Sequence, residues 1–275
     1  MNDSRKLRHV PGVIRGALVV GIFGALVWFE LRRPLRQPVQ SKLLRNARNL
    51  AVAGTAALAL QLAEAPVANP LSRTIVTRRI GILQCARLPL WAEVGAAVLL
   101  MDYTLYLWHV LTHVVPFLWR FHQPHHIDLD LDASTAIRFH FGELALSTIW
   151  RAAQIAAIGV SPLSLSVWQM FVFGCILFHH SNVRLPQRLE RSIGVVLVTP
   201  RMHGIHHSMV RDQTNSNWSS GLTIWDWLHG TLRLDVPQSE IRIGVPAYSN
   251  PGDVTLPKVL ALPFEPQRPS WELPA

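Results

Sequence analysis

Histidine is concentrated in one part of this chain and recurs there at spacings that suit metal binding. Twelve of the thirteen histidines fall within residues 109–229. Three clusters contain imidazoles three or four residues apart: His109-x-x-x-His113, His122-x-x-His125-His126 and His203-x-x-His206-His207. Side chains at that spacing share one face of a helix, so each cluster aims several imidazoles at one point. Neutral imidazole is a common ligand of iron, copper and zinc, and these clusters hold more ligands than one four-coordinate ion uses. The sequence therefore predicts a site with two metal ions.

The other histidines of residues 109–229 lie outside the three clusters, and we predict a different role for each. His179 and His180 are neighbours, so on a helix they point about 100° apart and only one of them faces the site. His140 is a candidate ligand, or a residue that orients a ligand. His229 has no partner at a metal-binding spacing and is expected to be structural.

An acidic residue accompanies the first cluster. Asp102, Tyr106, His109 and His113 follow one stripe of a predicted helix. A carboxyl group inside an apolar membrane run is costly, which makes Asp102 a functional candidate. We expect it to accept a hydrogen bond from a ligating imidazole or from Tyr106 and to fix its orientation. A polar contact between helices, without a role at the metal, is the alternative.

The elements that carry these residues are predicted to be membrane helices. The chain is 49% hydrophobic and 16% charged, whereas soluble domains contain about a quarter charged residues. Apolar runs occupy residues 10–29, 50–67, 88–115, 144–160 and 162–178, and a spanning helix needs roughly 17–25 residues. Buried helices of a large soluble protein are the alternative. The predicted fold is all-α, with about four to five transmembrane helices and a cytosolic helical cap that holds the metal site.

The order of the runs indicates on which side the histidines lie. Residues 159–162, Gly-Val-Ser-Pro, form a tight connection, so the two flanking helices are expected to be antiparallel. His140, His180 and the third cluster then share one membrane face with the end of run 88–115. Residues 31–49, which hold six Lys or Arg and no acid, also lie on that face and should be cytoplasmic by the positive-inside rule.

Charge and cysteine content exclude other classes. The net charge of +9 comes from basic residues scattered at the ends of apolar runs, which suits anionic lipid headgroups and not nucleic acid. Cys85 and Cys175 form no metal-binding spacing and are expected to be packing residues. Residues 233–275, rich in proline, are expected to form an extended C-terminal tail.

The predicted metal pair suits oxygen chemistry. Two iron ions with mainly nitrogen ligands can activate O2 to take hydrogen from an unactivated C–H bond, which gives an alcohol or, after loss of a second hydrogen, an alkene. A hydrolytic two-metal site more often contains bridging carboxylates, and acids are few near these clusters. The H-E-x-x-H and G-x-S-x-G motifs are absent, which excludes the protease and hydrolase classes that depend on them.

From about residue 102 to residue 232 the sequence resembles the fatty acid hydroxylase/sterol desaturase superfamily of membrane-bound di-iron oxygenases. The matched blocks include the three clusters, Thr135-Ala136-x-Arg138-Phe139-His140, His180-Ser181-Asn182 and Trp225-Asp226-Trp227-Leu228-His229-Gly230-Thr231. It is most similar to the bacterial sterol-desaturase-like branch. His180 is preferred over His179 because it begins a matched block. Trp218, Phe141 and His229 depart from the usual pattern and leave the substrate open.

The resemblance implies a set of metal ligands and partners. The implied ligands of the two iron ions are His109, His113, His122, His125, His126, His180, His203, His206 and His207. Asp102 and His140 are the supporting residues. O2 is the co-substrate, and electrons come from a separate protein (ferredoxin, cytochrome b5 or a reductase), since the chain shows no haem-binding domain.

These observations give one hypothesis and two rivals. The chain is interpreted as an integral protein of the bacterial inner membrane that hydroxylates or desaturates a lipid, with its active site on the cytoplasmic side. Residues 1–87 would supply N-terminal membrane helices, 88–232 the catalytic domain and 233–275 the tail. A membrane protein that binds or transports metal would need histidines through the depth of several helices. A bis-histidine haem protein would show a Soret band.

Overall fold

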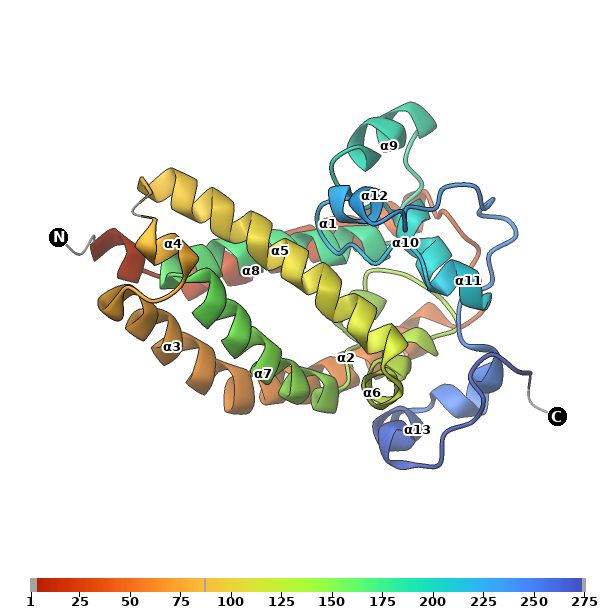
Figure 1. The fold of residues 1–275 in the computed structure, drawn as a ribbon. Coiled ribbons are helices and arrows are strands. Elements are labelled where there is room, and N and C mark those ends of the chain that lie inside the picture. The colour runs from red at the N-terminus through yellow and green to blue at the C-terminus, as the bar shows by residue number, and fades with distance from the viewer. Residues whose placement is uncertain (1–3, 87, 274–275) are drawn as a thin grey trace.

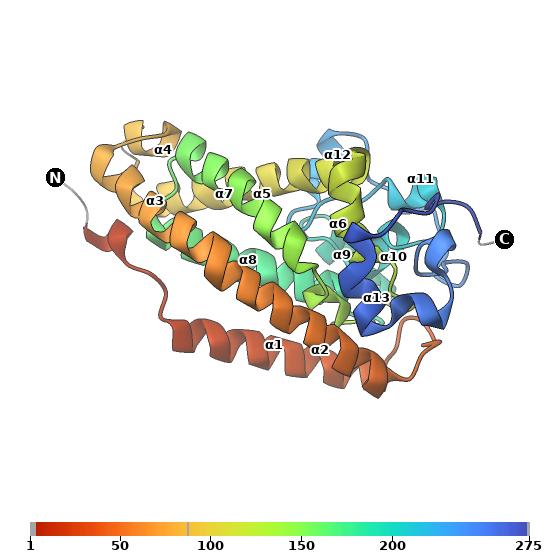
Figure 2. The ribbon, with the colours of Figure 1, turned by 90° about the horizontal axis from the view of Figure 1, so that it is seen from below.

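The computed structural model describes residues 4–86 and 88–273 and consists of a long helical bundle with a cap at one end (Figures 1 and 2). Its long helices are α1 (Gly12–Arg32), α2 (Lys42–Ala59), α3 (Ala65–Arg78), α5 (Leu90–Val114), α7 (Phe141–Ile158) and α8 (Pro162–His180). A π-helical turn, Leu60–Glu64, joins α2 to α3 without a break. The described residues form no strand, only three isolated bridges. The all-α prediction is confirmed.

Four helical segments are long and apolar enough to cross a membrane. They are Gly12–Arg32, Lys42–Cys85, Leu90–Val114 and Pro162–His180. This number agrees with the prediction of four to five spans. The segment that was expected to cross but is not among the four is α7. Its 18 residues include Glu143 and Arg151, and Arg151 lies 3.7 Å from Glu64 of the π-helical turn. α7 packs against α2 and α3, so its polar residues face protein.

The connection between α7 and α8 reverses the chain as predicted. Gly159 ends α7 with a φ of +85°, and Ser161 caps α8 by accepting a hydrogen bond from the backbone N–H of Ser164. A side chain at Gly81 would strike Gly159, so the short helix α4 (Ile82–Cys85) is held at this turn. α8 then packs on α5 and α1, and its C-terminal end returns to the cap.

The cap consists of short helices and loops around the ends of α5 and α8 (Figure 1). Its helices are α6 (Pro116–His126), α9 (Gln187–Gly194), α10 (Pro200–His206), α11 (Arg211–Thr214), α12 (Ile224–Leu228) and α13 (Leu256–Ala261). α6 begins with Pro116 and α10 with Pro200, since proline fits the first helical turn where no hydrogen bond from its nitrogen is needed. Thr199 caps α10.

Buried ion pairs connect the cap to α2. Asp128 accepts hydrogen bonds from Arg48 and Asn49, each at 3.0 Å, and lies 3.4 Å from the Nε of Arg45. Burial acts to raise the pKa of Asp128, but the guanidinium groups of Arg45, Arg138 and Arg48 outweigh it and hold that pKa below its ordinary value. The carboxylate is therefore charged and paired.

Arg138 extends this network to the helix that carries the second histidine cluster. Its side chain is fully buried, and it donates to the carbonyl of Pro124 at 3.0 Å and to Asn49 at 2.7 Å. Burial lowers the pKa of Arg138 to about 10, so the group remains charged near neutral pH. The backbone next to His125 is thus fixed to α2.

The prediction of an extended C-terminal tail is wrong. Residues 246–264 form three 3-10 turns and α13, and each of these begins with a proline in its first turn. A small core joins this segment to α2 and to the end of α6; it contains Val52, Ile127, Val245, Ala247, Tyr248, Val254, Val259 and Leu262. The prolines that suggested an extended chain in fact start short helices.

Candidate metal centre

The histidines that form the candidate site come from four helices whose ends meet in the cap. α5 supplies His109 and His113, one helical turn apart, and α6 supplies His122, His125 and His126. His180 is the last residue of α8, whereas His203, His206 and His207 lie on α10 and at its C-terminal cap. Because α5 and α8 both run toward the cap, residues more than 90 positions apart meet there.

These side chains form two groups, and within each group the potential ligand atoms lie within 4.8 Å of one another. The first group, called site A, is His109, His113, His122, His126 and His206. The second, called site B, is His125, His180, His203 and His207. All nine histidines named from the sequence are present in these two groups. Each site draws on α6, α10 and one long helix of the bundle.

In site B the nitrogens face one another. The Nε2 atom of His180 lies 3.0 Å from those of both His125 and His203, and the Nε2 atoms of His203 and His207 are also 3.0 Å apart. A neutral imidazole has one N–H donor and one lone pair, so a ring of facing Nε2 atoms is not fully satisfied by hydrogen bonds within it. The Nδ1 atoms of His125, His203 and His207 are buried, and they have no hydrogen-bond partner in the part of the chain that the structure describes.

Site A contains a similar excess of lone pairs. Both ring nitrogens of His113 are buried and have no hydrogen-bond partner among the described residues. The Nε2 atom of His206 is also unpartnered, and that of His126 lies 3.2 Å from that of His122. Buried polar atoms normally find partners, so these nitrogens fit a site where a cation is the missing partner.

Hydrogen bonds behind the rings fix their orientation. The Nδ1 atom of His109 lies 2.6 Å from the carbonyl of Trp218, that of His206 lies 2.8 Å from the carbonyl of Ser216, and that of His180 lies 2.8 Å from the carbonyl of Ile176. A carbonyl only accepts, so each Nδ1 carries the proton and each Nε2 presents a lone pair to its group.

His122 is oriented in the same way by an acid, since its Nδ1 atom lies 2.9 Å from Oε1 of Glu143 in the first turn of α7. The sequence assigned no role to Glu143. Glu143 lies three residues after His140 in the sequence, and this spacing did not indicate that its side chain would contact α6.

Burial keeps five imidazoles of sites A and B uncharged near neutral pH. It lowers the pKa of His125, His126, His203 and His207 well below the ordinary value, with a further lowering from neighbouring imidazoles. It lowers the pKa of His206 to about 3. A metal ligand must be the neutral form, so these groups are competent to bind a cation without first losing a proton.

Asp102 has different partners from those expected. Its Oδ2 atom accepts from the backbone N–H of Leu222 at 2.9 Å and from the indole Nε1 of Trp225 at 2.8 Å. Among the described residues its hydrogen bonds involve no histidine, and the hydroxyl of Tyr106 pairs with Thr231 instead. The prediction of a hydrogen bond to an imidazole or to Tyr106 is therefore wrong. The donors that the Asp102 carboxylate binds instead come from the loop before α12 and from the first turn of α12.

His140 lies outside both sites. Its Nδ1 atom accepts from the backbone N–H of Gly142 and so caps α7, while its Nε2 atom lies 3.1 Å from the carbonyl of Leu260. His229, expected to be structural, stacks on Tyr103 and Tyr106 with ring centroids 5.8 and 5.0 Å away.

His179, which was set aside in favour of His180, is buried with its ring centroid 4.0 Å from that of His203. It borders site B without belonging to it.

Comparisons with known proteins agree with this geometry. The model of the fatty acid hydroxylase family matches residues 94–231, which is half of the chain and includes every residue of sites A and B. The chain is 31% identical over 158 residues to ornithine lipid hydroxylase OlsE of Rhizobium tropici, covering 57% of this chain and 46% of that protein. It is 31% identical over 147 residues to cholesterol 25-hydroxylase of Mus musculus, covering 52% and 48%.

A third relative is alkylglycerol monooxygenase of Homo sapiens, with 29% identity over 143 residues that cover 51% of this chain and 30% of that protein. The chain therefore spans about half the length, or less, of these curated relatives. No solved structure matches the chain significantly.

Proposed function

This chain belongs to the fatty acid hydroxylase family, and we propose that it is a membrane-bound, O2-dependent di-iron enzyme that hydroxylates or desaturates a lipid. The observation that carries the proposal is the pair of buried histidine groups whose ligand atoms lie within 4.8 Å of one another. In this proposal site A holds one iron ion and site B the other. The bound iron pair supplies the activation of O2 for attack on a C–H bond.

The residues of the chain prepare the site for this chemistry. The carbonyls of Trp218, Ser216 and Ile176 hold the Nδ1 protons of three imidazoles, so the Nε2 lone pairs face inward. Glu143 does the same for His122. Seven of the nine histidines are buried, His109 is 9% exposed and His113 is partly buried, so water is largely excluded from the space between the sites. A nearly all-imidazole site favours iron, zinc or copper over magnesium or calcium.

The substrate class follows from the family and from the setting of the site. The names of the relatives refer to an ornithine lipid, cholesterol and an alkylglycerol. Four candidate membrane spans have one end near the cap, so a substrate with an alkyl or sterol portion is the class we propose.

Electrons would come from a separate ferredoxin, cytochrome b5 or reductase. The proposed location is the bacterial inner membrane with the site on the cytoplasmic side. The six Lys or Arg of residues 31–49, where α1 ends and α2 begins, support it.

The test is metal content together with turnover in matched variants. His125→Ala removes a ligand of site B and His113→Ala one of site A, and each is expected to lower iron per protein and abolish O2-dependent product formation from membrane lipids. His229→Phe, which changes an imidazole outside both sites, is the control and should retain the iron. Full activity in either alanine variant would refute the ligand assignment. Metal flux in proteoliposomes without O2 consumption would favour the transporter instead.

A further inference from the structure

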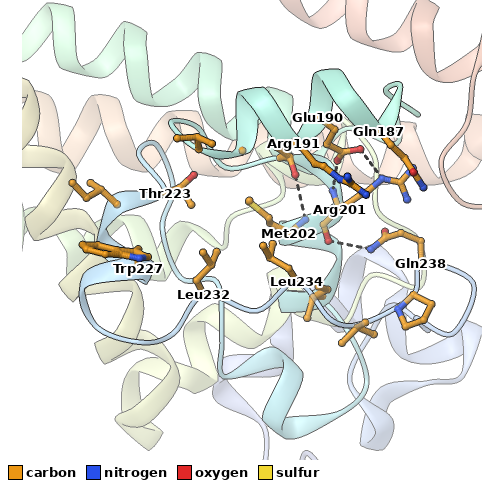
Figure 3. Close-up of a pocket in the computed structure, with 17 residues that line it drawn as sticks. Gln187, Glu190, Arg191, Arg201, Met202, Thr223, Trp227, Leu232, Leu234 and Gln238 are labelled. Carbon is orange, nitrogen blue, oxygen red and sulfur yellow. Dashed lines mark hydrogen bonds and ion pairs between the residues drawn. The ribbon is translucent and has the colours of Figure 1, made fainter.

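The cap contains a large cavity that is distinct from sites A and B. It measures about 720 Å³ and lies between α9, α10, α12 and residues 232–238 (Figure 3). Met202 and Ile205 of α10 line it, whereas His203 and His206 of the same helix belong to the two sites. α10 therefore forms a wall between the cavity and the histidines, and a molecule in the cavity does not reach the imidazole nitrogens.

The rim of this cavity is apolar and exposed. Val195 is 78% exposed, Trp227 71% and Leu234 62%, and all three line the cavity. Ile224 at the rim is also exposed, as are the adjacent Val196 and Leu228. A cluster of this kind on a protein surface marks an interaction site, because water-facing surfaces rarely gather so many large apolar side chains.

The position of α12 places this rim at the level of the membrane. The loop and helix are fixed to α5 through Asp102, which binds the Leu222 N–H and the Trp225 indole, and Tyr103 packs on Trp225 with ring centroids 4.9 Å apart. Asp102 is 12 residues after Leu90, or about 18 Å along a helix that rises about 1.5 Å per residue. A hydrocarbon core is about 30 Å thick, so the contact lies within the length of the span. The part of the rim that α12 forms therefore lies beside a candidate membrane span, where an exposed apolar surface can contact lipid.

The other end of the cavity is polar and cationic. Figure 3 shows Trp227 at one end and Arg191, Arg201 and Gln187 at the other, with Met202, Leu232 and Leu234 between them. Arg201 is paired with Glu190, with its Nε atom 2.6 Å from Oε2. The Arg191 side chain is exposed and forms no hydrogen bond or ion pair with any residue that the structure describes. A free guanidinium beside an apolar cavity matches an anionic headgroup attached to an acyl chain.

We propose that this cavity binds one anionic phospholipid of the surrounding bilayer. Its acyl chain lies along Met202 and Ile205, and its headgroup meets Arg191. The bound lipid attaches the edge formed by α9 and α12 to the membrane. Because α10 separates the cavity from the histidines, this lipid is a resident of the cap and not the molecule that is oxidised.

The test uses photoreactive lipids and the full chain in phosphatidylcholine nanodiscs. Phosphatidylglycerol or phosphatidylcholine with a diazirine in the acyl chain is added in turn, and crosslinked peptides are mapped by mass spectrometry. We expect the phosphatidylglycerol probe to label peptides that contain Ile205 or Leu232, several-fold more than the phosphatidylcholine probe. Arg191→Glu should reduce that labelling several-fold. Arg211→Glu, which reverses an exposed charge that does not line the cavity, should leave it unchanged.

Three results would overturn the proposal: equal labelling by the two probes, equal labelling in the two variants, or crosslinks confined to the spanning helices. The labelling needs no iron, O2 or turnover. A protein that is labelled as expected but never oxidises a lipid would therefore contradict the proposed function and leave this site intact.

Discussion

The rings of His126 and His207 stack with centroids 4.2 Å apart and planes 12° apart, although His126 belongs to site A and His207 to site B. One residue ends α6 and the other caps α10, so this contact fixes the distance between the two sites. His125 and His126 are neighbours in the chain and serve opposite sites. The double histidines of the second and third clusters, His125-His126 and His206-His207, are thus the elements that place two metal positions side by side.

Glu143 is expected to control the affinity for metal through His122. Replacing it with glutamine removes the charge that stabilises the Nδ1 proton of His122. Loss of such a partner typically weakens metal binding by roughly 10–100-fold. The measurement is iron retained by Glu143→Gln protein during dialysis against graded chelator concentrations. Glu240→Gln, at an exposed position, is the control, and equal retention in both variants would contradict the role of Glu143.

The buried ion pairs of Asp128 are expected to be a main source of stability for the cap. Removing one partner of a buried pair costs about 3–5 kcal/mol, because the other charge remains buried and unpaired. Asp128→Ala should therefore lower the thermal unfolding temperature in detergent far more than Glu265→Ala. Glu265 pairs with Lys258 at the surface, where such pairs contribute about 0–1 kcal/mol.

The same carboxylate predicts a pH dependence. The pKa of Asp128 in the folded protein lies below its ordinary value, so the unfolded chain binds this proton more tightly. Its contribution to stability is then complete above a pH of about 3.9, the ordinary carboxyl pKa, and is lost as the pH falls through the lower folded value. Asp128→Asn should remove this part of the acid dependence. An unchanged slope of unfolding temperature against pH in that variant would show that Asp128 is not responsible.

The orientation of the bundle can be tested with the native cysteines. Cys85 was expected to be a packing residue, but it is exposed at the end of α4, opposite to the cap, whereas Cys175 is buried. A membrane-impermeant thiol reagent should label Cys85 in intact spheroplasts if the cap is cytoplasmic. A cysteine introduced at exposed Arg211 in Cys85→Ser protein should react only after permeabilisation. The reverse pattern would place the cap on the outer side.

That the histidines of the three clusters would gather could be expected from the sequence, because ligand spacing is a local property of a helix. The i and i+4 histidines of each cluster share one helix face and belong to one site, whereas the i+3 histidines of the second and third clusters, His125 and His206, belong to the other site. The helical fold and the number of candidate spans followed from run lengths for the same reason. The family resemblance, not spacing, separated His180 from His179.

What could not be predicted depends on contacts between distant segments. The pairing of Glu143 with His122 required knowledge of how α6 and α7 meet. The contact of the His140 Nε2 atom with the carbonyl of Leu260 required knowledge of where the C-terminal segment lies. The proline-rich C-terminal segment was misjudged because its apolar residues are buried against distant parts of the chain, including Val52 of α2, Trp119 of α6 and Ile127 just after α6. Its short turns gain stability from that surface and not from their own periodicity.

Asp102 provides a prediction that links the membrane helix to site A. It holds the loop before α12 by accepting from the Leu222 N–H and the Trp225 indole, and the same loop presents the Trp218 carbonyl to His109. Asp102→Ala leaves two buried donors unpaired, at a cost of about 1–3 kcal/mol each. We expect faster hydrogen exchange in residues 218–231 and weaker iron retention, although Asp102 touches no imidazole. Asp102→Asn keeps an acceptor oxygen and should recover most of both properties. If Asp102→Ala lost iron while the exchange of this loop stayed unchanged, the carboxylate would act on the metal by another route than the one its contacts describe.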